Sequence, residues 1–319
     1  MEPKTLQEAI LYFSDPNRCR EWIMARRWPD GVECPRCGGK SVTFLAKYNR
    51  WQCGARHQSR QFTIKTGTIF EDSPLGLDKW LCAMWQIVND RNGISSWEIH
   101  RALGVSQKTA WFMDHRIRHA LQNGSILRMG QEGGPVEADE CFPGGKPKNM
   151  HAKRRAKLQA HGDKVPKPVV FGLFDRETRQ VRTKILPNVR REALMNEILD
   201  QVVLGSKVFT DAHKGYDGLL LKGYMHQFVS HMNEYVRGEV HTNSLENFWS
   251  LLKRGLTGTY IAVEPFHLSR YLDEQVFRFN HRKLTDSERF DRAVRQIVGK
   301  RITWDRLTGK EEGTQPEPF

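Results

Sequence analysis

The chain has 319 residues, enough for two or three domains that bury their own cores without a disulfide framework. It carries 50 Lys and Arg against 37 Asp and Glu, a formal net charge of +13. This excess favours a polyanionic partner, because phosphates attract Lys and Arg and release counterions on contact. Six scattered cysteines do not indicate a secreted disulfide scaffold. No signal peptide or run of 18 apolar residues is present, so we expect a cytoplasmic protein without a membrane span, and the basic excess fits association with the nucleoid.

Changes of composition along the chain predict five segments. Residues 5–28 have apolar residues at helical spacing, residues 31–66 are rich in Gly, Cys and basic residues, and residues 74–123 have helical periodicity. A polar, Gly-rich linker over residues 128–135 precedes a region in which strands and helices alternate. The expected segments are an N-terminal helical segment (1–29), a zinc ribbon (30–68), a helix-turn-helix segment (69–127), an α/β catalytic domain (136–290) and a C-terminal tail (291–319).

Three cysteines and one histidine in the second segment have the spacing of a metal site. Cys34-Pro-Arg-Cys37-Gly is a metal knuckle, in which the glycine permits the tight turn after two thiolates. Cys53 is the third candidate ligand and His57 the fourth, since a second Cys-x-x-Cys is absent. We predict a structural Zn²⁺ site; the alternative is two reduced cysteines in a turn with an unrelated Cys53.

Residues 94–121 have the pattern of a helix-turn-helix. The first helix ends at Leu103, Gly104 supplies a left-handed turn, and Ser106 is a natural N-cap for the second helix. The first residues of the second helix would then meet base edges and phosphates: Gln107, Lys108 and Thr109. The alternative is a helical hairpin used for packing or protein contacts.

The α/β region is expected to contain strands at residues 136–141, 169–174, 180–185 and 207–210, with helices at 190–203 and 243–254. Between the first two strands, residues 146–167 contain eight Lys or Arg. This segment is either a solvated basic loop or a contact for the DNA backbone that orders on binding.

Two of these strands and one helix carry the acids that suggest chemistry. Asp139 lies on the first strand, Asp211 follows an apolar strand at its C-terminal edge, and Glu246 lies on an amphipathic helix. Carboxylates that converge from separate elements form a hard-oxygen site for Mg²⁺ or Mn²⁺, and two such ions suit phosphodiester chemistry. Asn243 and Glu246 are three residues apart, so they are neighbours on the helix. A lone acid is more often a surface carboxylate or helix cap, but three in these contexts argue against that interpretation.

The motifs together resemble the insertion-sequence transposases that combine an N-terminal zinc ribbon with a ribonuclease-H-like DDE domain. The resemblance covers residues 20–285, and the gap of 35 residues from Asp211 to Glu246 is one that DDE enzymes often show. The matching stretches are residues 34–38, 66–70, 136–140, 210–216, 241–255 and 271–282.

The resemblance implies roles for particular residues. Asp139, Asp211 and Glu246 would hold two metal ions, with Asn243 as an alternative third ligand or a support for Glu246. Lys253 would lie against the DNA end, and the adjacent Arg254 is assigned to DNA as well. Water would be activated to nick the ends of the element, and the freed 3′-hydroxyl would attack target DNA. An oligomer that pairs two ends is also implied.

We therefore expect a DNA transposase. Two other functions stay open from the sequence: a catalytically inactive DNA-binding regulator derived from such an enzyme, and a metal-dependent nuclease of the same fold. The presence of Asp139, Asp211, Glu246 and Lys253 argues against the regulator. Inverted repeats flanking the coding region would favour transposition over simple cleavage.

Overall fold

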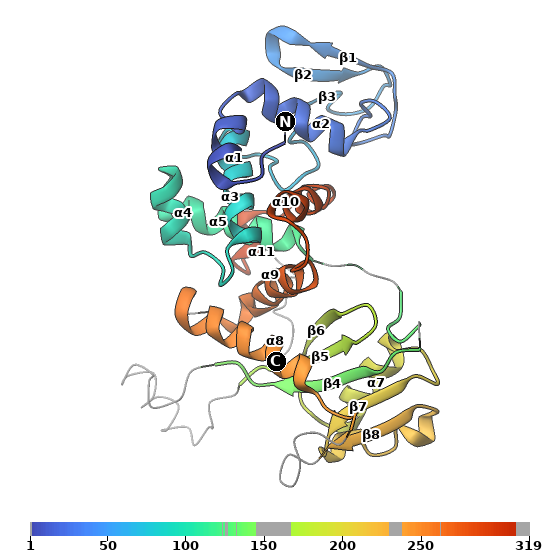
Figure 1. Cartoon of the computed structure of the whole chain (residues 1–319). Coiled ribbons are helices and arrows are strands. Elements are labelled where there is room, and N and C mark those ends of the chain that lie inside the picture. Colours follow the sequence, from blue (N-terminus) through green and yellow to red (C-terminus); the bar gives the residue numbers. More distant parts are fainter. Residues whose placement is uncertain are drawn as a thin grey trace. The chain divides into compact units, whose positions relative to one another are not determined.

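The computed structural model describes residues 2–122, 124, 127–131, 133–144, 167–229, 238–261 and 263–310. The basic segment therefore lies, up to residue 166, outside the described residues. The chain forms two compact units, one of residues 1–122 with 281–314 and the other of residues 123–280 with 315–319 (Figure 1). Residues 281–310 thus belong with the N-terminal part of the chain, although the sequence assigned them to the α/β domain and the tail. The independence of the five expected segments remains a prediction.

The first unit contains a small antiparallel sheet and seven α-helices among the described residues. Phe290 of α10 explains why the end of the chain belongs here, because its ring stacks on Trp22 and contacts Trp85, both at 5.0 Å between centroids. The elements are α1 (Leu6–Phe13), α2 (Pro16–Arg27), β1 (Val42–Leu45), β2 (Arg50–Cys53), β3 (Gln61–Phe62), α3 (Leu77–Asn89), α4 (Ser96–Leu103), α5 (Gln107–Ala120), α10 (Asp286–Val294) and α11 (Trp304–Leu307).

Helices α4 and α5 are joined by the turn that the sequence predicts. Ser95 and Glu98 form a capping box at the start of α4, so two otherwise unpaired backbone N–H groups are satisfied. Gly104 ends α4 with a left-handed φ of 59°, a conformation that costs glycine least. The Ser106 hydroxyl then accepts a hydrogen bond from the Thr109 N–H and starts α5. The expected helix boundaries are therefore confirmed.

The second unit is built on a five-stranded sheet in the order β6-β5-β4-β7-β8 (Figure 1). Strands β4, β5 and β6 are antiparallel neighbours, whereas β7 runs parallel to both β4 and β8. The short, half-exposed β8 was not predicted, since its residues lack a clear apolar alternation. The bounds are β4 (Val136–Cys141), β5 (Val169–Asp175), β6 (Gln180–Leu186), α7 (Arg191–Gln201), β7 (Lys207–Asp211), β8 (Met225–Val229), α8 (Asn243–Arg254) and α9 (Leu268–Asn280).

Alternation along β4 separates two cores. Val136 and Ala138 face the core that includes α7 residues, whereas Cys141 faces the core formed with α8 and α9. Helices therefore cover both faces of the sheet, as expected for strands that are apolar on both sides. In the described part of the chain, no helix is long and apolar enough to cross a bilayer.

Gly172 allows α8 to lie close to the sheet. It pairs with Asp139 across β4 and β5. A Cβ atom at this position would lie 2.5 Å from Trp249 Cζ2 and 3.1 Å from Leu245 Cδ2. The missing side chain thus makes room for the Trp249 indole, which contacts β5 at Gly172 and bonds to Asp139.

Substitution of Gly172 by Ala is expected to destabilise the second unit. The added methyl overlaps the Trp249 ring, and overpacking of this kind costs about 1–3 kcal/mol. Urea denaturation would measure the change in the free energy of unfolding. Gly258→Ala is the control, because its Cβ would meet no atom within 4 Å. Equal stability of the two variants would show that α8 does not depend on this close approach.

Candidate metal centres

The first centre is formed by the three cysteines and the histidine that the sequence selected. Cys34, Cys37, Cys53 and His57 offer ligand atoms that all lie within 4.8 Å of one another. Cys34 Sγ lies 3.5 Å from His57 Nε2, and Cys37 Sγ lies 3.6 Å from Cys53 Sγ. Ligands of a tetrahedral Zn²⁺ lie about 3.6–3.8 Å apart when the bonds are about 2.1–2.3 Å long. The four residues therefore fit a closed structural zinc site.

The surrounding backbone prepares these ligands. His57 Nδ1 lies 2.8 Å from the Gln58 carbonyl oxygen, a contact that leaves Nε2 free to bind a metal. Burial tends to raise the pKa of Cys34, but the N–H groups of Arg36 and Cys37 oppose it and bring the pKa down to about 7. Cys34 can thus be a thiolate at neutral pH, the form that binds zinc.

Replacement of Cys53 by Ser is expected to abolish zinc binding, because a hydroxyl is a poor substitute for the buried thiolate. One zinc per chain in the wild type and none in Cys53→Ser is the expected result of elemental analysis. Cys19→Ser is a matched control: its buried Sγ donates to the Phe13 carbonyl oxygen, a bond that serine can also make. Full zinc content in Cys53→Ser would exclude Cys53 as a ligand.

The second centre lies where β4 and β7 separate. The last paired residues of these parallel strands are Glu137 and Phe209, two positions before Asp139 and Asp211. Asp139, Asp211 and Glu140 place carboxylate oxygens within 4.8 Å of one another at this point. Ligand sites of α/β sheets commonly lie at such carboxyl ends. Two of the predicted acids are thus brought together, and Glu140 is a third that the sequence analysis did not select.

The electrostatics of this centre fit a divalent cation. Burial, followed by the charge of Asp211, raises the pKa of Asp139 to about 6. Burial also raises the pKa of Glu140 to about 8, and the charges of Asp211 and Asp139 add to the effect. Within the described residues, Glu140 Oε1 is buried without a hydrogen-bond partner. Crowded carboxylate oxygens are the donor set that Mg²⁺ or Mn²⁺ prefers.

Helix α8 carries the other predicted residues, and two of its side chains act on Asp139. Trp249 Nε1 donates a 2.9 Å hydrogen bond to Asp139 Oδ2. Glu246 is exposed on the first turn; its charge helps to raise the pKa of Asp139, but it lies outside the three-carboxylate group. Lys253 is exposed two turns later and opposes the rise that burial produces in the pKa of Cys141. Asn243 and Arg254, at the two ends of α8, are also exposed.

A buried ion pair fixes the start of α8. Glu137 is 0% exposed, and its Oε1 accepts a 2.6 Å hydrogen bond from Arg176 Nε. Its Oε2 accepts from the N–H groups of Ser244 and Leu245 at 3.0 and 3.2 Å, so it caps a helix whose own N-cap side chain does not. Arg176 also donates to the His241 carbonyl oxygen at 2.8 Å. Sequence reasoning missed this group, although an acid two residues before Asp139 on the same face was a visible signal.

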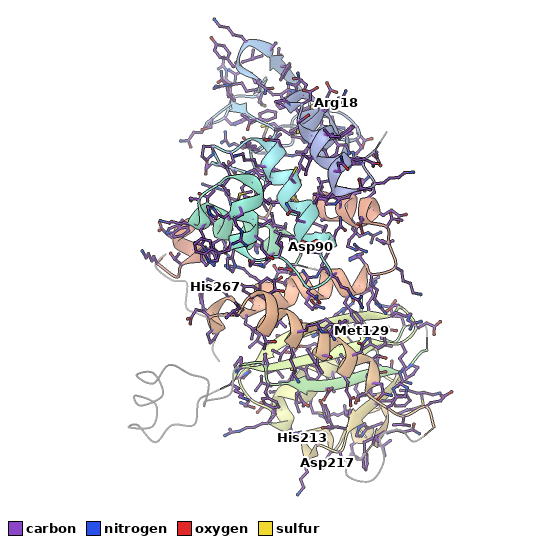
Figure 2. All side chains as sticks on the ribbon, turned by 60° about the vertical axis from the view of Figure 1, so that its left-hand side comes forward. Arg18, Asp90, Met129, His213, Asp217 and His267 are labelled. Atoms are coloured by element: carbon purple, nitrogen blue, oxygen red, sulfur yellow. The ribbon has the colours of Figure 1, made fainter. Side chains whose placement is uncertain are left out.

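The segment after β7 is held by short-range contacts. The His213 N–H donates to Asp211 Oδ1 at 3.0 Å, and His213 Nδ1 accepts from the Gly215 N–H. Figure 2 shows His213 and Asp217 at the outer edge of the second unit. The backbone thus fixes one oxygen of Asp211.

The residues predicted to read DNA lie at the start of α5. Gln107 Nε2 donates to Ser96 Oγ at 3.0 Å, and Thr109 Oγ1 lies 2.7 Å from Ser106 Oγ. Lys108 is exposed, with its ammonium 4.5 Å from the ring centroid of Trp304. Gln107 and Thr109 therefore already take part in the turn, whereas Lys108 presents its charge at the surface.

We expect the free energy of unfolding of the wild-type protein to fall, relative to that of Glu140→Gln, as pH rises from about 4.5 to about 8. The protein is zinc-loaded and the buffer contains no magnesium. An acid whose pKa is higher in the folded chain binds its proton more tightly there, so the free energy of unfolding falls as that proton is lost. Mg²⁺ should abolish the loss, because it favours the ionised form. Urea denaturation across this pH range measures the difference in the free energy of unfolding between the two proteins. A difference that does not change with pH would show that ionisation of Glu140 is not unfavourable in the folded chain.

Comparisons with known proteins place both centres in named domains. Residues 131–280 match the model of the ISXO2-like transposase domain, and residues 14–58 match that of the transposase zinc-ribbon domain. A Halobacterium salinarum protein in transposable element ISH50 is 31% identical over 279 residues, which cover 82% of this chain and 90% of the relative. A transposase-like protein of Haemophilus influenzae is 30% identical over 105 residues, which cover 33% of this chain and 85% of the relative.

Proposed function

This chain belongs to the insertion-sequence transposases that join a zinc ribbon to an ISXO2-like transposase domain, and we propose that it cuts the ends of its element and joins them to target DNA with the help of divalent metal ions. The observation that carries the proposal is the convergence of Asp139 and Asp211 where β4 and β7 separate. We further propose a ribonuclease-H-like fold for the second unit. Its mixed five-stranded sheet, with helices on both faces, supports this assignment.

The metal would supply charge stabilisation for the attacking and leaving oxygens of a phosphodiester. In the proposed site, Asp139 and Asp211 hold it from the sheet and Glu246 completes the set from α8. Trp249 occupies one oxygen of Asp139 and the His213 N–H one oxygen of Asp211, so each acid is oriented before a metal binds.

Glu246 is preferred to Asn243 as the third ligand. An anionic oxygen binds Mg²⁺ better than an amide oxygen does. Both residues are exposed on the first turn of α8, but only the charge of Glu246 acts on the pKa of Asp139. We assign Asn243 to the support of Glu246.

Recognition of DNA is assigned to several surfaces. Lys253 and Arg254 are exposed near the end of α8, about two turns after Glu246, and can meet phosphates of the DNA end. The zinc ribbon and the start of α5, with Lys108 foremost, would bind the terminal repeats. Pairing of two ends would require a homo-oligomer on DNA, and we expect the protein at the nucleoid.

Asp211→Asn is expected to bind the ends of the element but to neither nick nor join them, because loss of one carboxylate removes charge from the metal site while the protein surface is kept. Cleavage and strand transfer with Mg²⁺ and DNA carrying the element's own ends measure both steps. Glu246→Gln should lower the rate at least about a hundredfold, and Asn243→Ala by less, if Glu246 is the third ligand.

The exposed acid Glu192 provides the matched control, as Glu192→Gln should retain full activity. A wild-type protein that binds the ends yet never cuts with Mg²⁺ or Mn²⁺ would instead be a DNA-binding regulator. Cutting without joining would make it a nuclease. A larger loss in Asn243→Ala than in Glu246→Gln would transfer the ligand role to Asn243.

A further inference from the structure

We infer that Glu140 binds the divalent cation directly, so that the sheet alone offers three carboxylates, from Asp139, Glu140 and Asp211. This inference rests on the proposed function, because it adds a ligand to the same metal site. It departs from the sequence pattern, in which Glu140 shares a face of β4 with Val136 and Ala138 and points away from Asp139.

The end of strand pairing explains how neighbouring residues on opposite faces reach one point. The pairing of β4 with β7 ends at Glu137 and Phe209, before it reaches Asp139. Beyond it, no β7 residue is paired with β4, so side chains from both faces of β4 can turn toward the end of β7. Carboxylate oxygens of Glu140, Asp139 and Asp211 lie within 4.8 Å of one another there. Oxygens bound to one Mg²⁺ lie about 3–4 Å apart, so a small adjustment suffices.

A buried carboxylate oxygen at this centre indicates a missing partner. Tyr216 is 0% exposed, and its hydroxyl interacts with the Glu140 side chain. Within the described part of the chain, Glu140 Oε1 makes no hydrogen bond of ordinary geometry. A buried polar atom without a partner is unfavourable. A cation bound to Glu140 would supply the partner that this oxygen lacks, while the Tyr216 hydroxyl orients the carboxylate.

Among the described residues, no Lys or Arg forms an ion pair with Asp139, Glu140 or Asp211, whereas Glu137 on the same strand is paired with Arg176. Crowded, partly buried carboxylates without a cationic partner are unfavourable. A divalent ion bound by the three carboxylates of the sheet would supply this cationic partner, without a contribution from Glu246 of α8. The inference therefore requires that the protein bind metal without DNA.

The competing explanation is that Glu140 is a neutral structural group paired with Tyr216. Under that explanation Glu140→Gln, which keeps the shape and an acceptor oxygen, leaves metal affinity unchanged. Under the inference it removes an anionic ligand. The two explanations therefore differ in metal affinity, a property that requires no catalysis.

The experiment is Mn²⁺ binding to the zinc-loaded, full-length protein without DNA, with free Mn²⁺ followed by electron paramagnetic resonance. Glu140→Gln and Asp211→Asn are each expected to raise the Kd for Mn²⁺ about tenfold or more. Tyr216→Phe should raise it by a smaller factor, because only the orienting hydroxyl is lost. Glu192→Gln, which changes an exposed acid in the same way, should bind as the wild type does. Thermal melting of each variant tests its folding, and Glu140→Asp replaces Glu140→Gln if the latter does not fold.

The outcomes separate this inference from the proposed function. An unchanged Kd in Glu140→Gln together with a weakened Asp211→Asn overturns the role of Glu140 and leaves the metal site intact. Unchanged affinity in both variants overturns the metal site itself. Absence of Mn²⁺ binding by the wild type without DNA also overturns the inference, since three carboxylates of the sheet are then insufficient.

Discussion

The buried carboxylate of Glu137 is the interaction on which the second unit depends. A charge with no exposure is tolerated only when every oxygen is paired, because its desolvation is otherwise far too costly. Arg176 satisfies one oxygen and the first N–H groups of α8 satisfy the other. The partial positive charge of a helix N-terminus adds to this attraction. The start of α8 is therefore fixed on β4, two residues from Asp139.

The rest of the candidate site follows from that anchor. With the N-terminus of α8 held at the Glu137 carboxylate, Trp249 lies over Gly172 and donates a hydrogen bond to Asp139. Glu246 and Lys253 are three residues before and four after this tryptophan, so they lie on nearly the same side of the helix. One buried acid thus orients a second acid through a helix and an indole. Arg176 also holds the segment before α8, because it donates a hydrogen bond to the His241 carbonyl oxygen.

Strand β4 places acids in two opposite electrostatic environments. The Glu137 carboxylate is paired with the Arg176 guanidinium and two backbone N–H groups, and its role is structural. Asp139 and Glu140 follow where pairing with β7 has ended, and burial and mutual repulsion raise the pKa of both. The folded chain therefore disfavours the ionised forms of these acids, and a bound cation would favour them. Such pKa shifts at a strand end are typical of functional sites.

The sequence alone determined the parts that local rules control. The spacing of three cysteines and a histidine selected the four residues that the structure brings together in the ribbon, the alternation of β4 placed its strand, and Gly104 with Ser106 determined the turn between α4 and α5. The family also followed from motifs of this kind. These features depend on neighbours a few residues away, so the sequence encodes them directly. The roles of Glu137 and Glu140, the Trp249 bond, strand β8 and the packing of Phe290 were decided by tertiary structure. They depend on where strand pairing ends and on which distant segments fill a core, and no periodicity of one segment specifies either.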